Sequence, residues 1–198
     1  MTLKIAFLIY DTAAELDIVG PWDVFAASKF LNKGGLETYT VAITEEPVTC
    51  SGGLRMIPSY SIKNAPRPDI LVVPGTVDPL PMTKNAEIMN WIADMDSTTQ
   101  WTVGVCTGSI LLVGAGVAKD KRVNTHWSYV DMLKNSKDVT VVDKARYVRD
   151  GKLVTSAGVT AGIDLALWLT GQLFGPEHAR AAQHLLEYYP APPYAADV

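Results

Sequence analysis

The 198-residue chain has little of what marks several large classes of protein. Its two cysteines are too few for a disulfide framework, which favours a reducing, cytoplasmic location. Its three histidines show no metal-ligand spacing and no glycine-rich phosphate loop is present, so we expect neither metal nor cofactor. No apolar run is long enough to span a membrane. With 19% charged residues and a net charge of −4, the chain offers no basic stretch for nucleic acid.

The composition is that of an ordinary folded domain. Hydrophobic residues make up 48% of the chain, enough for a sizeable core in one domain over residues 1–198. The apolar start, residues 1–10, is short and lacks a small-residue cleavage site. It therefore predicts a first strand and not a signal peptide.

Apolar strand patterns alternate with helical patterns along the chain. Strands are predicted over residues 4–10, 37–44, 70–73, 103–105, 139–142, 145–148 and 153–155. A pair of short strands is predicted over residues 48–57. Helices are predicted over residues 21–31, 86–95, 109–113, 160–173 and 176–187. The first of these helices is expected to begin at Pro21, with Glu15 as a solvated side chain before it. This order is typical of an α/β fold, with a mostly parallel sheet between two layers of helices.

Cys106 lies where a predicted strand meets a predicted helix, between Gly104 and Gly108. A sharp strand-to-helix turn strains its central residue, and small neighbours relieve the crowding. Such a turn lifts a nucleophile off a sheet, and the N-terminus of the next helix favours thiolate over thiol. We therefore expect a nucleophile whose pKa lies below about 8.5. The alternative is an inert buried cysteine, which is the reading we give to Cys50.

Asp17 is the second candidate for chemistry. Its neighbours Leu16 and Ile18 are apolar, so burial is expected to raise the pKa of its carboxyl group. Asp17, Gly75 and Cys106 all follow predicted strands, and ligands of such sheets bind at the carboxyl ends of the strands. Asp17 could therefore pass a proton near Cys106. Alternatively, it braces the loop before the helix by hydrogen bonding.

Three segments are candidates for binding an anion or the substrate. The backbone N–H of Thr107 and the loop at Gly75 and Thr76 could stabilise developing negative charge, although a threonine at a helix start also often caps it. His126 lies 20 residues after Cys106 and is either a general base or a structural residue. The segment around Val159 could line the pocket. Other large residues nearby are expected in the core: Trp127, Ile163 and Trp168.

Several motifs together resemble one known superfamily. They are the residues 16–21, Ser-Gly-Gly at 51–53, Pro-Gly at 74–75, Cys-Thr-Gly-Ser at 106–109, Thr-His-Trp at 125–127, residues 160–164 and residues 186–194. The chain resembles the DJ-1/PfpI superfamily over its whole length, and within it the isonitrile (isocyanide) hydratases. The Cys-Thr-Gly and Thr-His-Trp motifs also occur in the related domain of AraC-type regulators. The loop at 76–79 departs from the hydratase pattern.

The resemblance implies a flavodoxin-like three-layer sandwich of the class I glutamine amidotransferase type. It implies hydration of organic isonitriles to N-substituted formamides without a cofactor. Cys106 would form a thioimidate, and Asp17 would act as general acid and base. The alternatives are glyoxalase-like or deglycase-like chemistry on small carbonyls, or a non-enzymatic domain that senses a ligand or oxidation through Cys106.

The resemblance also implies a homodimer. Four residues of the first predicted helix would suit a contact between two identical copies: Val24, Phe25, Ala26 and Phe30.

Overall fold

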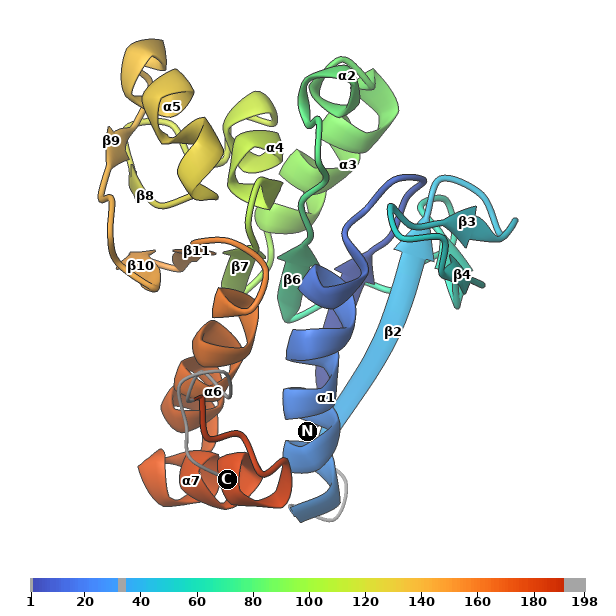
Figure 1. Cartoon of the computed structure of the whole chain (residues 1–198). Helices are drawn as coiled ribbons and strands as arrows, with labels where there is room; N and C mark the ends of the chain where they lie inside the picture. Colours follow the sequence, from blue (N-terminus) through green and yellow to red (C-terminus); the bar gives the residue numbers. More distant parts are fainter. Residues whose placement is uncertain (1, 32–34, 191–198) are drawn as a thin grey trace.

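The computed structural model describes residues 2–31 and 35–190 (Figure 1). Its centre is a seven-stranded sheet in the order β10-β11-β7-β6-β1-β2-β5. All neighbouring pairs are parallel except β10 and β11, which form a hairpin. The strands are β1 (Leu3–Leu8), β2 (Leu36–Ala42), β5 (Tyr60–Ser61), β6 (Ile70–Val73), β7 (Trp101–Gly104), β10 (Tyr147–Asp150) and β11 (Leu153–Ser156). The mostly parallel sheet confirms the predicted fold class.

Helices cover the sheet in two groups. Helices α1 (Glu15–Leu31), α6 (Ala161–Phe174) and α7 (Pro176–Leu185) pack on one another, and Figure 1 shows them gathered away from α3 (Ala86–Asp96) and α4 (Gly108–Gly114). Right-handed crossovers explain the division, because β1 to β2 and β6 to β7 step in opposite directions along the sheet. In the part of the chain that is described, no helix has the length and apolarity to cross a membrane.

Smaller elements connect these layers. The predicted pair of short strands forms as β3 (Val48–Thr49) and β4 (Arg55–Met56), which pair antiparallel. The sequence did not predict α2 (Leu80–Thr83), α5 (Val130–Ser136) or the 3₁₀ helix at Trp127–Tyr129. It also missed the parallel pairing of β8 (Arg122–Val123) with β9 (Thr140–Val141). These segments are too short to show a periodic pattern.

The core centres on β1, whose residues 5–8 have no exposed surface. The Phe7 ring packs against Trp22 and Phe25 of α1, with ring centroids 5.2 and 6.3 Å apart. Burying one such side chain stabilises the fold by about 1.5–3 kcal/mol. A strand covered on both faces explains the near-continuous apolar run in the sequence.

The sequence predicted that the first helix begins at Pro21, and this prediction is wrong. Helix α1 begins at Glu15 and contains Pro21 in its interior. A proline there cannot donate a hydrogen bond to the preceding turn. Packing against α6 compensates, because a side chain on Gly162 would lie 3.2 Å from the Pro21 ring and one on Gly20 would lie 3.0 Å from Ile163. As a consequence, Asp17 lies in the first turn of α1 and not in a connecting loop.

The predicted dimer surface is wrong in part. Val24 and Phe25 are 0% and 1% exposed and belong to the core, so they cannot contact a second copy. Ala26 and Phe30 are exposed, and dimerisation through them stays a prediction. The last residues of the motif at 186–194 lie outside the described part of the chain.

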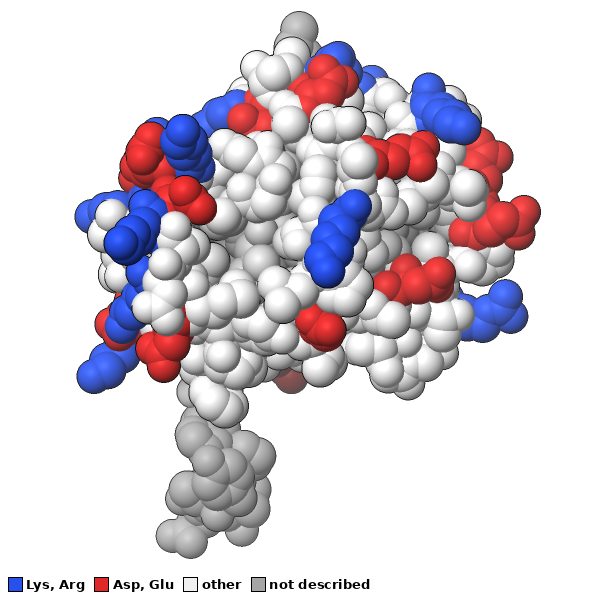
Figure 2. All heavy atoms as spheres, turned by 90° about the horizontal axis from the view of Figure 1, so that it is seen from above, with Lys and Arg blue, Asp and Glu red and all other residues white. Residues whose placement is uncertain are grey.

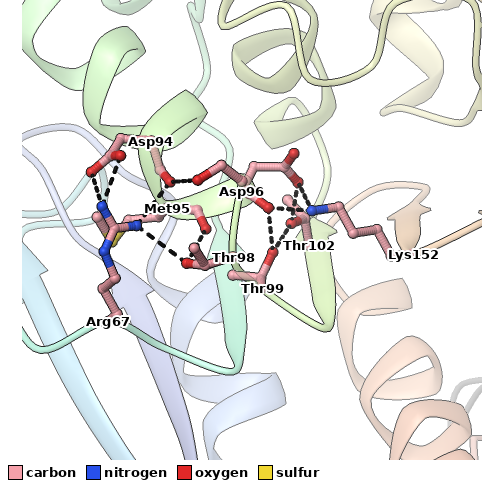
Figure 3. A network of polar contacts seen from close by, with 9 residues as sticks. Arg67, Asp94, Met95, Asp96, Thr98, Thr99, Thr102 and Lys152 are labelled. Carbon is pink, nitrogen blue, oxygen red and sulfur yellow. Dashed lines mark hydrogen bonds and ion pairs between the residues drawn. The ribbon is translucent and has the colours of Figure 1, made fainter.

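A polar network fixes the end of β7 that lies away from Cys106 (Figure 3). Arg67 donates to both carboxylate oxygens of Asp94 at 2.8 Å. The Asp96 carboxylate accepts a hydrogen bond from Thr102 at 2.6 Å and pairs with Lys152 at 3.3 Å. These contacts join α3 to the first residues of β7 and to the β10–β11 turn. Strand β7 is therefore held in register while its other end carries the Cys106 turn.

Gly108 tests how tightly this turn packs. A Cβ atom at residue 108 would overlap the carbonyl group of Val73, lying 2.9 Å from its carbon. We expect Gly108→Ala to destabilise the fold by about 1–3 kcal/mol, the usual effect of overpacking. The control is Gly171→Ala inside α6, where the nearest atom lies 3.5 Å away. Thermal unfolding should show a lower midpoint for the first variant and an equal or higher one for the second. Equal midpoints would contradict the packing argument.

Candidate active site

The residues of the candidate site follow four adjacent parallel strands. Their order is β11-β7-β6-β1, and the segments after them carry Val159, Cys106, Gly75 and Asp17 respectively. Strands are added in opposite directions on the two sides of the β6–β1 pair, since β1 leads to β2 and β6 leads to β7. This is the switch point where ligands of such sheets bind. The predicted convergence of Asp17, Gly75 and Cys106 is therefore confirmed.

Cys106 occupies the strand-to-helix turn predicted for it. Its φ of 57° lies in the left-handed region, which is uncommon for a residue with a side chain. Gly104 permits this turn, since a Cβ there would lie 2.8 Å from Leu112 and 3.0 Å from the Ser109 nitrogen. The Cys106 side chain is nearly enclosed, with 6% of the residue exposed. The backbone N–H groups of Thr107 and Val159 stabilise the ionised form of its sulfur atom by hydrogen bonding.

Asp17 is completely buried. Its Oδ2 atom accepts a hydrogen bond from the Gly75 N–H at 2.9 Å. Its Oδ1 atom has no hydrogen-bond partner of its own within the described residues. Burial raises the pKa of Asp17 to about 6, against the lowering effects of the Gly75 N–H and the Cys106 side chain. The free Oδ1 atom is the position at which a proton can be held.

Cys106 does not have the lowered pKa that the sequence suggested. Burial and, to a lesser extent, the negative charge of Asp17 raise the pKa of the Cys106 thiol to about 11. The N–H groups of Val159 and Thr107 lower this pKa, but by less. A buried carboxyl and thiol side by side cannot both ionise near neutral pH, so the pair holds one proton.

The loop after β6 does not supply the free N–H groups predicted for it. The Gly75 N–H is bound to Asp17, and the Thr76 N–H donates to the Thr107 hydroxyl at 2.8 Å. That hydroxyl donates in turn to the Thr76 carbonyl oxygen at 2.7 Å and makes no capping bond to α4. The Thr107 side chain thus fastens this loop to the Cys106 turn. The donors left for the reacting centre are the N–H groups of Thr107 and Val159.

His126 has a structural role in the described contacts. Its Nδ1 atom lies 2.7 Å from the Ser128 hydroxyl and accepts from the Ser128 N–H at 3.4 Å. This bond caps the 3₁₀ helix at Trp127–Tyr129. Trp127 is 80% exposed, so its expected place in the core is wrong. Trp168 is half-buried and packs its ring on Trp101, and Ile163 is also half-buried.

Glu15 is not the freely solvated side chain that the sequence predicted. Its carboxylate accepts hydrogen bonds from Ser51 Oγ at 3.1 Å and from the Gly52 N–H at 2.5 Å. These bonds lower the pKa of Glu15. They fasten the β3–β4 turn to the first turn of α1. The sequence did contain a signal for this contact, because the N–H groups of a Ser-Gly-Gly turn are exposed and can bind a nearby carboxylate.

A cavity of about 170 Å³ opens onto Cys106. Its walls were only partly predicted, because four of its residues belong to no candidate motif for chemistry: Ala14, Val77, Ser128 and Tyr129. Residues expected there, Thr76, Thr107, His126 and Val159, do line it. Among the described residues no group of His, Cys, Asp or Glu side chains could hold a metal ion.

The comparisons with known proteins agree with this geometry. A model of the DJ-1/PfpI family matches residues 3–172. The chain belongs to the DJ-1/PfpI family. Isonitrile hydratase from Pseudomonas putida is 37% identical to it over 194 residues, covering 98% of this chain and 82% of that protein.

Two further DJ-1/PfpI relatives bear on the function. The crystal structure of a THiJ/PfpI family protein from Pseudomonas syringae superposes with a TM-score of 0.90 and 34% identity, covering 100% of this chain and 80% of that one. The HTH-type transcriptional regulator CdhR from Pseudomonas aeruginosa is 32% identical over 133 residues, covering 67% of this chain and 39% of the regulator. The family thus includes regulators beside an enzyme.

The coupling between Asp17 and Cys106 can be measured directly. In a Cys50→Ala background, thiolate absorbance should show Cys106 titrating near pH 11. Asp17→Asn removes the neighbouring negative charge, so the pKa of Cys106 should fall. Gly75 can still donate to the Asn side chain, which keeps the loop in place. An unchanged or higher Cys106 pKa in Asp17→Asn would show that the two groups do not interact.

Proposed function

We propose that the chain hydrates organic isonitriles to N-substituted formamides. The observation that carries this proposal is the buried pair of Asp17 and Cys106, which holds one proton between about pH 6 and pH 11 and of which Cys106 lines a small cavity. The reaction needs one nucleophile and one proton donor at the same carbon atom, and the pair supplies both. The 37% identity to an isonitrile hydratase over nearly the whole chain supports the same chemistry.

The first step joins the thiol sulfur to the substrate. The proton of the pair moves onto Asp17 Oδ1, which leaves Cys106 as a thiolate. The sulfur attacks the terminal isonitrile carbon, and Asp17 delivers its proton to that carbon, giving a thioimidate. The N–H groups of Thr107 and Val159 donate hydrogen bonds that stabilise the thiolate before attack.

The second step uses water. Asp17, now a carboxylate, takes a proton from a water molecule as the oxygen adds to the thioimidate carbon, and it passes this proton to the nitrogen. The second water proton returns to Asp17 as the carbon–oxygen double bond forms and the thiolate leaves. The formamide departs, and the pair again holds one proton.

Variants at both residues test this assignment. Cys106→Ala should abolish formamide formation from an aryl or alkyl isonitrile, because no covalent intermediate can form. Asp17→Asn should lower kcat by about 10²- to 10⁴-fold, the usual share of general acid–base catalysis. Cys50→Ala is the matched control and should keep nearly full activity, since Cys50 is not part of the Cys106 cavity.

The same assays contain the outcomes that would overturn the proposal. Turnover of methylglyoxal without formamide formation would assign glyoxalase-like chemistry to the pair. Absence of turnover with either substrate class, together with selective oxidation of Cys106, would favour a sensing domain. An active Asp17→Asn variant of normal stability would remove the general-acid role.

The pH profile should follow the shared proton. Below about pH 6 both groups are protonated and no thiolate is available, so kcat/KM should rise as pH increases through this value. Near pH 11 the pair loses its last proton, and with it the acid, so activity should fall. Rates of formamide release across this range give the profile. A profile without an ascending limb near pH 6 would contradict the one-proton requirement.

A further inference from the structure

A second and larger cavity adjoins the one at Cys106. Its volume is about 560 Å³, and His126 and Val159 line both cavities. The catalytic cavity, at about 170 Å³, lies below the range of roughly 300–1,000 Å³ typical of sites that enclose whole ligands. A substrate that reacts at Cys106 and exceeds the small cavity must therefore extend beyond it.

Trp127 forms a wall of this second cavity. Its side chain is 80% exposed, and its ring lies beside that of His126, with centroids 5.4 Å apart and planes inclined by 38°. The capping bond between His126 and Ser128 fixes the turn that carries both rings. A group that passes His126 from the catalytic cavity therefore meets an ordered aromatic face. Such faces bind flat apolar groups by stacking.

The charges around the second cavity largely neutralise one another. Lys134 pairs with Asp143 at 2.7 Å. Arg146 binds Asp164 at 2.5 Å and donates to the Thr160 hydroxyl. Figure 2 shows Lys and Arg interspersed with Asp and Glu on the face seen from above, with uncharged atoms over much of its middle. This balance favours a neutral group over an ionic one.

A cleft of about 460 Å³ adjoins the catalytic cavity on the other side and shares Thr76 and Val77 with it. Its lining includes the hydroxyl groups of Thr12 and Ser51 and the carboxylate of Asp78, but no aromatic ring. It is the competing route for a substituent, and it offers no stacking surface.

We propose that the second cavity binds the nitrogen substituent of the substrate, and that this substituent is a neutral aromatic group lying against Trp127. The inference rests on the proposed isonitrile hydration and adds the substrate class. It makes Trp127 a specificity residue, while Cys106 and Asp17 perform the chemistry.

The test compares 2-naphthyl isonitrile with ethyl isonitrile. The ratio of their kcat/KM values should fall about tenfold in Trp127→Ala and should be largely restored in Trp127→Phe, which keeps an aromatic face. Ile57→Ala removes an apolar side chain that is 77% exposed and lies outside these cavities, so the ratio should stay at the wild-type value. Trp127 has a similar exposed fraction, 80%, so its replacement should leave the stability of the fold nearly unchanged.

The outcomes separate the two proposals. If the wild type hydrates both isonitriles and Trp127→Ala leaves their ratio unchanged, this inference is overturned and the hydratase function stands. Met82 lines the opposite cleft and not the catalytic cavity. A ratio that responds to Met82→Ala and not to Trp127→Ala would place the substituent in that cleft and overturn the inference as well. If the wild type hydrates neither compound, the function and the inference fail together.

Discussion

The cost of burying the Asp17 carboxyl group is the constraint on which the site depends. A carboxylate without solvent is unfavourable unless it is hydrogen-bonded or protonated, and this one has a single backbone donor, the Gly75 N–H. Its other oxygen has no partner within the described residues. The protonated form of Asp17 is therefore more favoured than that of a carboxyl group in water, and its pKa is raised to about 6. With the pKa of Asp17 near 6 and that of Cys106 near 11, the neighbouring groups together hold one proton between these values. Desolvation thus places a potential acid and a potential nucleophile at one point.

Cys106 and its N–H donor Val159 both lie in strained turns that packing keeps in place. Cys106 and Val159 have φ values of 57° and 38°, and such conformations cost on the order of 1–3 kcal/mol each. Tight packing stabilises them: Gly108 lies against the Val73 carbonyl, and Gly158 lies against the His126 ring. The strained turns direct the N–H of Val159 and that of Thr107 at the sulfur atom. The stability of the central sheet therefore supports a geometry that an isolated loop would not keep.

The two ends of the central strands have different roles. At one end, Asp94, Asp96, Arg67 and Lys152 form ion pairs that join neighbouring segments (Figure 3). At the other end, loops and short helices surround the cavities. A rigid sheet that carries variable loops can change its substrate without changing its chemistry. Trp127 lies in one of these short helices.

The sequence by itself determined the order of the main strands and helices and the strand-to-helix turn at Cys106, because apolar periodicity and local glycines act over a few residues. The apolar neighbours of Asp17 likewise indicated that its pKa is raised. It misplaced the start of α1, since packing against Gly162 outweighs the local preference of Pro21. The tertiary structure alone decided which N–H groups remain free, whether burial or the helix terminus controls the Cys106 pKa, and which aromatic side chain lines a cavity. These properties depend on contacts between residues far apart in the chain, which no local pattern records.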